Sequence, residues 1–461
     1  MHPKNRSFSE LSLSPAMLEN LESLGYLNMT PIQEAALRPA LAGRDLIAQA
    51  ETGSGKTAAF ALPLLTKLNA RNFATQALVL CPTRELATQV AQELRRLARH
   101  HQNIKIVTLC GGQAIGPQIG SLEHGAHVVV GTPGRITDHL RKQTLSLDRV
   151  ATLVLDEADR MLEMGFVDDL ASIIGRIPDT RQTLLFSATY PDDIEQLSGR
   201  FQRSPQRILV ESKMTLDNID ERFFICQKAD RLQSLQTLLM QFRPLSAVIF
   251  CNTKQLVRDV ESFLQQRGVS ALALHGDMEQ RDRDQVLIQF KQQSCTVLVA
   301  SDVAARGLDI DDLSVVINFE LPRDPDTYVH RIGRTGRAGK QGLALNLFAD
   351  SERFKLDRLG EALGREISFE SLTGTPPARE PLAAPQFVTL CIAGGKKQKV
   401  RAGDILGALT GEAGIPGSAV GKIAITDFQS YVAVARDQVD AAHGRLLNGK
   451  IKGRKFKLRR L

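Results

Sequence analysis

A glycine-rich segment that contains a lysine and a threonine, AETGSGKT at residues 50–57, has the composition of a phosphate-binding loop. It follows the apolar run DLIAQA and precedes the helical pattern KTAAFALPLLTKL, which predicts a strand before it and a helix after it. Glycines let backbone N–H groups point at phosphates, Lys56 can reach the terminal phosphates, and the hydroxyl of Thr57 can coordinate Mg²⁺. The segment therefore predicts a nucleoside triphosphate site, and a glycine-rich turn without a ligand is the minor alternative.

An acidic tetrapeptide, DEAD at residues 156–159, ends the apolar run TLVL. A carboxylate at the C-terminal end of a strand can hold the water shell of Mg²⁺, and a second one beside it can orient an attacking water. We assign Asp156 to the metal and Glu157 to the water. Alone, such a tetrapeptide is more often the acidic first turn of a helix. Together with the phosphate loop, it predicts a nucleoside triphosphatase.

A basic cluster in the second half of the chain, HRIGRTGRAGK at residues 330–340, places Arg331, Arg334 and Arg337 three residues apart. Residues at this spacing share a helix face, where like charges repel by a few tenths of a kcal/mol per pair. No Asp or Glu between Thr327 and Ala349 neutralises them. The cluster therefore predicts an anionic ligand, with a solvated basic face as the open alternative.

The elements that must position these residues are apolar runs of strand length interleaved with helical patterns. The runs are DLIAQA, ALVLCPT, HVVVGTP, TLVLDEAD and TLLFSAT, and then AVIFCNT, ALALHG, TVLVASD and SVVINFE. Continuous Val, Ile and Leu is typical of buried parallel strands, so we predict two α/β domains, residues 1–212 and 213–370. The proline-rich residues 371–386 predict a semi-rigid linker, and residues 387–461 a small third domain.

Composition excludes several classes of protein. The 461 residues are 43% hydrophobic, enough for two or three globular domains, and the six cysteines are scattered without a CxxC pair that would indicate a zinc site. No apolar stretch is long enough to cross a bilayer and no signal peptide is evident, so we expect a cytoplasmic protein. The chain has a net charge of +7, and its basic character belongs to residues 387–461, where 14 Lys or Arg against 5 Asp or Glu give +9 and leave −2 for residues 1–386. Such a tail predicts a nucleic-acid partner.

The order of the short motifs resembles that of the DEAD-box RNA helicases. The motifs are AETGSGKT, PTREL (82–86), GG (111–112), TPGR (132–135), DEAD, SAT (187–189), VIFCNT (248–253), ASDVAARGLD (300–309) and HRIGRTGR (330–337). The resemblance covers about residues 7–370. It implies an α/β fold of two tandem RecA-like domains with parallel sheets, ATP and Mg²⁺ as cofactors, and RNA as the partner.

The resemblance also implies roles for residues around the nucleotide. Arg334 and Arg337 would be arginine fingers on the γ-phosphate, His330 and Arg331 would couple the site to neighbouring motifs, and Ser187 and Thr189 would link hydrolysis to strand separation. The residues expected to bind ATP are Phe8 and Gln33 in the adenine-reading segment 7–35, Thr52, Gly53, Ser54, Gly55, Lys56 and Thr57 in the loop, and Asp309 at the ribose. Phe8 is alternatively an ordinary core anchor.

Three motifs of the first domain join a strand end to a helix start, where backbone N–H groups and an arginine can hold RNA phosphates. Taken separately, PTREL and TPGR could be plain helix N-termini. Together with two positions of the second domain, they resemble a bipartite RNA groove. The expected contacts are Arg84, Gly112, Thr132, Arg135, Gln280 and Arg283.

Residues 387–461 resemble the C-terminal RNA-binding domain of one DEAD-box subfamily, an atypical α+β RNA recognition motif. The resemblance implies binding to a 23S rRNA hairpin near the peptidyl-transferase centre and a role in assembling the large (50S) ribosomal subunit. Lys450, Lys452, Arg454 and Lys455 are the expected RNA contacts, against the alternative of a solvated terminus. Phe428 and Tyr431 are left open as aromatics that could stack on bases.

The sequence thus predicts a monomeric, RNA-stimulated ATPase that locally unwinds short duplexes. A ribosomal-RNA-binding assembly factor that uses ATP only to time its release is the alternative. A metabolic kinase with a phosphate loop fits the nucleotide site, but it does not account for the second domain or the basic tail.

Overall fold

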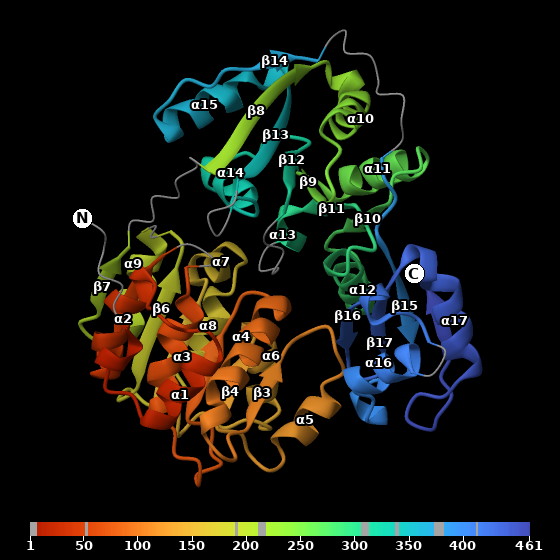
Figure 1. Cartoon of the computed structure of the whole chain (residues 1–461). Helices are drawn as coiled ribbons and strands as arrows, with labels where there is room; N and C mark the ends of the chain where they lie inside the picture. Colours follow the sequence, from red (N-terminus) through yellow and green to blue (C-terminus); the bar gives the residue numbers. More distant parts are fainter. Residues whose placement is uncertain are drawn as a thin grey trace. The chain divides into compact units, whose positions relative to one another are not determined.

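The protein is described by a computed structural model that covers residues 7–50, 54–189, 192–210, 218–305, 313–336, 341–372, 382–411 and 414–461. The chain divides near residue 214 into two compact units. One unit holds the first α/β domain, and the other holds the second α/β domain and the C-terminal domain (Figure 1). Among the described helices, none combines the length and hydrophobicity that a bilayer crossing requires.

The first domain is a seven-stranded parallel sheet with helices on both faces (Figure 1). Its strands are β1 (Leu46–Gln49), β2 (Ala77–Leu80), β3 (Ile106–Leu109), β4 (Val128–Gly131), β5 (Thr152–Asp156), β6 (Gln182–Ser187) and β7 (Gln206–Leu209). Its helices are α1 (Pro15–Ser23), α2 (Pro31–Leu41), α3 (Lys56–Thr66), α4 (Arg84–Leu97), α5 (Gly116–Leu122), α6 (Pro133–Arg141), α7 (Ala158–Glu163), α8 (Val167–Ile174) and α9 (Asp192–Phe201). The strand order is β3-β4-β2-β5-β6-β1-β7.

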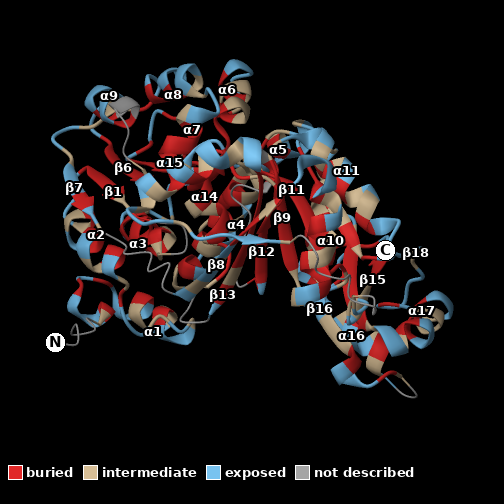
Figure 2. Cartoon of the chain, turned by 90° about the horizontal axis from the view of Figure 1, so that it is seen from above, coloured by how far each residue is buried: buried red, intermediate tan, exposed pale blue. Residues whose placement is uncertain are grey.

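The continuous apolar strands of this sheet fill two cores, one on each face. In β5, Val154 packs into the core that contains residues of α1 to α4, whereas Leu153 and Leu155 pack into the core that contains residues of α6 and α8. Side chains of a strand point alternately to opposite faces, so a strand covered on both sides must be apolar at every position. Figure 2 shows the strands of the sheet as buried and the outer faces of the helices as exposed.

The second domain repeats this architecture. Its strands are β8 (Ile219–Cys226), β9 (Ala247–Cys251), β10 (Ala271–Leu274), β11 (Val297–Ser301), β12 (Val315–Asn318), β13 (Gly342–Ala349) and β14 (Glu370–Ser371). Its helices are α10 (Arg231–Phe242), α11 (Lys254–Gln265), α12 (Gln280–Lys291), α13 (Asp302–Ala305), α14 (Pro325–Ile332) and α15 (Arg353–Leu363). The order β10-β11-β9-β12-β13-β8-β14 matches that of the first sheet, strand for strand. A loop that follows a strand of the first sheet therefore has a counterpart after the strand at the same position in the second sheet.

The C-terminal domain is a four-stranded antiparallel sheet with two helices packed against it. Its elements are β15 (Phe387–Ile392), α16 (Ala402–Thr410), β16 (Val420–Ile425), β17 (Ser430–Ala435), α17 (Val439–Asn448) and β18 (Leu458–Arg460), with the strand order β16-β17-β15-β18. Leu390, Ile392 and Val432 pack into the core shared with these helices. The predicted fold class, two parallel α/β domains followed by a small α+β domain, is confirmed.

The end of α12 in the second domain covers part of the other face of the C-terminal sheet. The Gln292 amide donates to the carbonyl oxygens of Lys422 (2.9 Å) and Tyr431 (3.1 Å), and its oxygen accepts from the Thr389 hydroxyl (2.8 Å). The residue after Gln292, Gln293, has a φ of 56°, which ends the helix and turns the chain. These contacts join the C-terminal domain to the second domain within one unit.

Candidate active site

The phosphate loop leaves β1 and enters α3, as predicted. Gly55 has a φ of 96°, and a Cβ there would lie 2.5 Å from the Gln33 amide nitrogen, so only glycine fits. Lys56, the first residue of α3, is buried, and its Nζ donates to the carbonyl oxygen of Ala50 at 2.8 Å. Two predicted loop residues, Thr52 and Gly53, lie outside the described residues.

The adenine-reading segment is packed onto this loop. The Gln33 amide nitrogen donates to the carbonyl oxygen of Gly55 at 3.1 Å, while its oxygen accepts from the backbone N–H of Thr30 at 2.9 Å. Gln33 therefore ties the start of α2 to the phosphate loop. Phe8 is 3% exposed and meets the ring of Tyr26 edge-on at 6.1 Å, as the core-anchor alternative requires.

The remaining loop residues, Ser54 and Thr57, flank Lys56 at the N-terminus of α3. The first N–H groups of a helix have no intrahelical partner, so this end can receive an anion. The loop also lies at the same sheet edge as two other motifs, because β5, β6 and β1 are parallel neighbours that end in DEAD, SAT and the phosphate loop.

The acidic pair sits at the end of β5. Asp156 closes the strand, and Glu157 adopts a left-handed conformation (φ 53°, ψ 53°) that turns the chain sharply into α7. Left-handed backbone is rare for a residue other than glycine and is often found at functional sites. Both carboxylates are buried, and among the described residues neither Asp156 Oδ1 nor Glu157 Oε2 has a hydrogen-bond partner.

Burial raises the pKa of Asp156 to about 7, against the opposing effect of the nearby Lys56 charge. A buried carboxylate oxygen without a hydrogen bond is stabilised by a cation, so Asp156 Oδ1 fits a magnesium site. No cluster of three or more His, Cys, Asp or Glu suited to a metal occurs among the described residues. Mg²⁺ would therefore be held here together with nucleotide phosphates and water, as is usual for this ion.

The last residue of DEAD connects this loop to SAT. Asp159 Oδ2 accepts from the Thr189 N–H and hydroxyl, both at 2.9 Å, and from the Ala188 N–H at 3.2 Å. The Asp159 N–H donates to the Ser187 hydroxyl at 3.3 Å. Although burial raises the pKa of Asp159, the bonds from Thr189 outweigh it and hold the pKa below its usual value. Sequence reasoning assigned Ser187 and Thr189 a coupling role but missed Asp159, which is the residue they contact.

The predicted RNA-contact residues of the first domain lie along one edge of its sheet. β3, β4 and β2 are parallel neighbours, so their C-terminal ends place Gly112, Thr132 and Arg84 side by side. Gly112 has a φ of 67°, and Thr132 and Arg84 stand at the starts of α6 and α4. Arg135 donates to the carbonyl oxygen of Gln113 at 2.9 Å. The structure therefore brings these four together.

The corresponding edge of the second domain holds Gln280 and Arg283 in the first turn of α12. Gln280 donates to Asp284 at 2.8 Å, and Arg283 donates to the carbonyl oxygen of Ala304 at 3.3 Å. The latter bond joins α12 to α13, which begins in the ASDVAARGLD motif. Asp309 of that motif lies outside the described residues.

Arg331 is the centre of a buried polar network and is 2% exposed. Its guanidinium donates to both carboxylate oxygens of Asp302 (2.6 and 2.7 Å), to the side-chain oxygens of Asn252 and Asn318 (2.8 Å each), and to the carbonyl oxygen of Glu320 (2.8 Å). The Arg331 side chain thereby joins the C-terminal ends of three strands, β9, β11 and β12. Sequence reasoning assigned Arg331 to coupling but did not identify these partners.

We expect Arg331→Met to lower the free energy of unfolding of the second domain by about 3–5 kcal/mol, because the Asp302 carboxylate would lose its buried partner. Urea unfolding followed by circular dichroism measures this. The control is Arg353→Met, which removes an exposed pair with Asp350 and should cost less than about 1 kcal/mol. Equal effects of the two substitutions would contradict the central role of Arg331.

The other residues of this motif follow α14. His330 is in its last turn, and Arg334 lies just beyond it, with its backbone oxygen accepting from the Leu313 N–H at 3.3 Å. Arg334 is buried, whereas Arg337 lies outside the described residues. Of the regularly spaced arginines, Arg331 is therefore a structural centre, and Arg334 lies three residues further along, beyond the end of α14.

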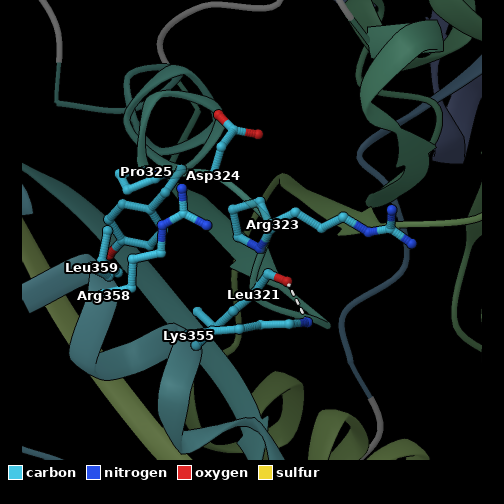
Figure 3. A pocket seen from close by; sticks show the side chains of 9 residues that line it. Leu321, Arg323, Asp324, Pro325, Lys355, Arg358 and Leu359 are labelled. Carbon is cyan, nitrogen blue, oxygen red and sulfur yellow. Dashed lines mark hydrogen bonds between the residues drawn. The ribbon is translucent and has the colours of Figure 1, made fainter.

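A separate pocket of the second domain lies beside the start of α14 and is lined by Arg323, Lys355 and Arg358 among others (Figure 3). Lys355 Nζ donates to the carbonyl oxygen of Leu321 at 3.2 Å, drawn as a dashed line, and to Glu352 at 3.2 Å. No predicted site residue lines this pocket, and its Lys355 is already paired. The pocket is therefore not part of the candidate site.

The four predicted RNA contacts of the C-terminal domain lie at a tight turn between α17 and β18. Ile451 and Arg454 exchange backbone hydrogen bonds of 2.8 and 3.0 Å, and Lys452 and Gly453 between them both have positive φ. Lys450, Lys452, Arg454 and Lys455 are all exposed. Lys452 also donates to the carbonyl oxygen of Lys399 at 3.1 Å. The turn therefore offers positive charge to a phosphate backbone.

The two candidate stacking aromatics differ in exposure. Tyr431 is 2% exposed, on the sheet face that Gln292 contacts, and burial raises its pKa to about 12. Phe428, at the turn between β16 and β17, is 64% exposed. Of the two, Phe428 alone is open to a base.

Three family models match this chain. The DEAD/DEAH box helicase model matches residues 30–197, the helicase conserved C-terminal domain matches residues 230–339, and the DbpA RNA binding domain matches residues 389–460. Each matched range lies within one of the domains described above.

Known proteins resemble the chain over most or all of its length. It is 52% identical to the ATP-dependent RNA helicase DbpA of Escherichia coli over 99% of both chains, and 46% identical to the DEAD-box ATP-dependent RNA helicase CshA of Bacillus cereus over 78% of this chain and 69% of that protein. The structure of S. cerevisiae Dbp5 bound to RNA and ADP BeF3 is 32% identical and matches with a TM-score of 0.70, covering 79% of this chain and 95% of that one. The chain therefore belongs to the DEAD-box ATP-dependent RNA helicases and is of the DbpA type.

Proposed function

We propose that this helicase separates short duplexes of 23S ribosomal RNA during assembly of the large ribosomal subunit. The observation that carries the proposal is a DbpA-type RNA-binding domain with an exposed basic turn, attached to a complete helicase core. Contacts to the RNA backbone are tolerant of sequence, so the core alone would accept many RNAs. The C-terminal domain would select the hairpin near the peptidyl-transferase centre. A cytoplasmic monomer fits this role.

In the proposed mechanism, residues of the first domain bind and orient MgATP. Lys56 would exchange its bond to the Ala50 carbonyl for the terminal phosphates of ATP. Thr57 and Asp156 would hold Mg²⁺. Held there, Mg²⁺ would supply positive charge that offsets the charge developing on the phosphates. Glu157 orients the attacking water and accepts its proton, for which a buried carboxylate oxygen without a hydrogen bond is suited.

The second domain would complete the reaction. Arg334 and Arg337 stabilise the charge that develops on the γ-phosphate, and Asp309 contacts the ribose. Phosphoryl transfer depends on such positioned charges rather than on covalent chemistry by the protein. ATP and RNA together would close the two domains, and closure would bend one strand out of a duplex.

The structural effect of ATP hydrolysis would be transmitted to the bound RNA through the DEAD and SAT motifs. The carboxylate of Asp159 binds the backbone and the hydroxyl of Thr189, so a movement of the DEAD loop when the γ-phosphate leaves must also move SAT. This link supports the proposed coupling of hydrolysis to release of the separated strand.

To test targeting, the four basic residues of the tight turn are replaced by alanine in the full chain. Each lysine or arginine that neutralises a phosphate adds to affinity, so we expect binding of a 23S rRNA fragment containing the hairpin to weaken by roughly ten- to a hundredfold. Maximal ATP turnover with saturating unstructured RNA should be unchanged. Fluorescence anisotropy and a coupled ATPase assay measure the two quantities. The control variant replaces the exposed residues Arg243, Arg323, Arg353 and Arg358 by alanine.

Equal weakening for the ribosomal fragment and for unstructured RNA would contradict a targeting role of the turn. Strand separation distinguishes the remaining alternative, a ribosomal-RNA-binding factor that uses ATP only to time its release. If the parent protein hydrolyses ATP on the ribosomal fragment but does not release a short strand annealed beside the hairpin, that alternative holds.

A further inference from the structure

A buried arginine next to the acidic pair has no part in the mechanism above. Arg160 lies on α7, one turn after Glu157, and its Nη1 is 3.3 Å from Glu157 Oε2. The side chains of Arg160 and Glu157 are each 5% exposed. A guanidinium is strongly disfavoured in the interior without a partner, so a buried arginine at this position requires an explanation.

The pair is held by charge and not by a hydrogen bond. Neither Arg160 Nη1 nor Glu157 Oε2 has a hydrogen-bond partner among the described residues. The neighbouring Asp159 differs, because it accepts bonds from Ala188 and Thr189 that occupy one of its oxygens. Glu157 thus keeps lone pairs available while a fixed positive charge stands beside it.

The backbone and the ion pair together define the direction of the Glu157 side chain. The left-handed conformation of Glu157 sets where the side chain leaves the chain, and Arg160, one helical turn later, attracts its far end. The other nearby cation, Lys56, influences Asp156 and Asp159 and is the residue proposed to turn to the ATP phosphates. Arg160 would then remain as the partner of Glu157 when the nucleotide is bound.

We propose that Arg160 is a positioning residue for hydrolysis, one that aims the Glu157 carboxylate at the attacking water without occupying its oxygens. This inference rests on the proposed role of Glu157. Because a reacting group displaced by about 1 Å can lose a hundredfold in rate, the direction of this carboxylate should matter more for turnover than for nucleotide binding.

The test is the substitution Arg160→Gln in the full chain, with ATP turnover measured at saturating RNA. We expect kcat to fall by roughly ten- to a hundredfold, while KM for ATP and the affinity for a fluorescent ADP stay within about twofold of the parent. Arg160→Lys keeps the charge and should return kcat to within about threefold of the parent. The matched control is Arg176→Gln, which removes the same charge from an exposed position of the same domain and should leave kcat unchanged.

Three results would overturn the proposal. They are an unchanged kcat in Arg160→Gln, an equal loss of kcat and ADP affinity, and a kcat in Arg160→Lys no higher than in Arg160→Gln. If Arg160→Gln does not fold, as judged by its thermal unfolding, the comparison of Arg160→Lys with the parent decides. A kcat of Arg160→Lys within about threefold of the parent supports positioning by the charge, and a kcat reduced more than tenfold contradicts it. Glu157→Gln is assayed alongside Arg160→Gln. Full turnover in Glu157→Gln refutes the role of Glu157. If Glu157→Gln is inactive while Arg160→Gln is fully active, only the role of Arg160 is refuted.

Discussion

Replacing Glu157 with glutamine should lower RNA-stimulated ATP turnover by about 10³-fold, since a general base contributes roughly 10²–10⁴-fold to such reactions. Glutamine has nearly the same shape as glutamate but cannot accept the proton of the attacking water. The local fold should tolerate it, because the left-handed backbone at this position is set by the turn from β5 into α7 and is already adopted by a residue with a side chain. A coupled ATPase assay at saturating RNA measures the loss.

Nucleotide and RNA binding should survive this change. Lys56, Thr57 and Asp156 are all retained, so the affinity for ATP should stay within about threefold, which a filter-binding assay with labelled ATP checks. The variant should also hold RNA longer than the parent does, because strand release is expected to follow hydrolysis. Glu163→Gln, at the exposed end of the same helix, is the control and should behave as the parent. Turnover at the parent rate in Glu157→Gln would show that another group orients the water.

Arg334→Ala should nearly abolish turnover, by about 10³–10⁵-fold, which is the range found for arginine fingers in phosphoryl transfer. The guanidinium would act on charge that exists fully only in the transition state, so kcat should fall while binding of ATP to the first domain changes little. Rapid-quench measurement of phosphate release under single-turnover conditions separates the chemical step from product release.

Because Arg334 is buried, folding must be checked together with activity. The unfolding midpoint of Arg334→Ala in urea should be compared with that of the parent and of Arg358→Ala, whose side chain is exposed beside the pocket of Figure 3. Arg358→Ala should keep full turnover. A folded Arg334→Ala protein with turnover within tenfold of the parent would exclude Arg334 as a finger.

Much of the site could be predicted from local sequence, because in a parallel α/β sheet the residues after each strand lie at one edge. The apolar run before the phosphate loop and the run before Asp156 each predict a strand. In the structure Asp156 is the last residue of β5, and Lys56 begins α3 directly after the loop that leaves β1. The same reasoning placed Arg84 and Thr132 at helix starts. These predictions needed only short-range periodicity and residue chemistry.

Contacts between distant segments could not be predicted in this way. Asp159 meets Thr189, thirty residues later, since β5 and β6 are neighbours, and Arg331 meets Asp302 and Asn252 because their strand ends adjoin α14. Periodicity predicts that a strand exists but not which strand lies beside it. The spacing of the arginines likewise could not reveal that Arg331 is fully engaged inside its own domain.

The sequence by itself determined the chemistry of this protein, because the residues that can bind a triphosphate, Mg²⁺ and RNA occur in short motifs whose local geometry is set by neighbouring residues. Tertiary structure alone decided how those residues are supported. It buried the ion pair of Arg160 and Glu157, joined Asp159 to SAT, and covered Tyr431 while leaving Phe428 exposed. Burial and long-range pairing arise from the order of strands and the packing of whole domains, which no short stretch of sequence contains.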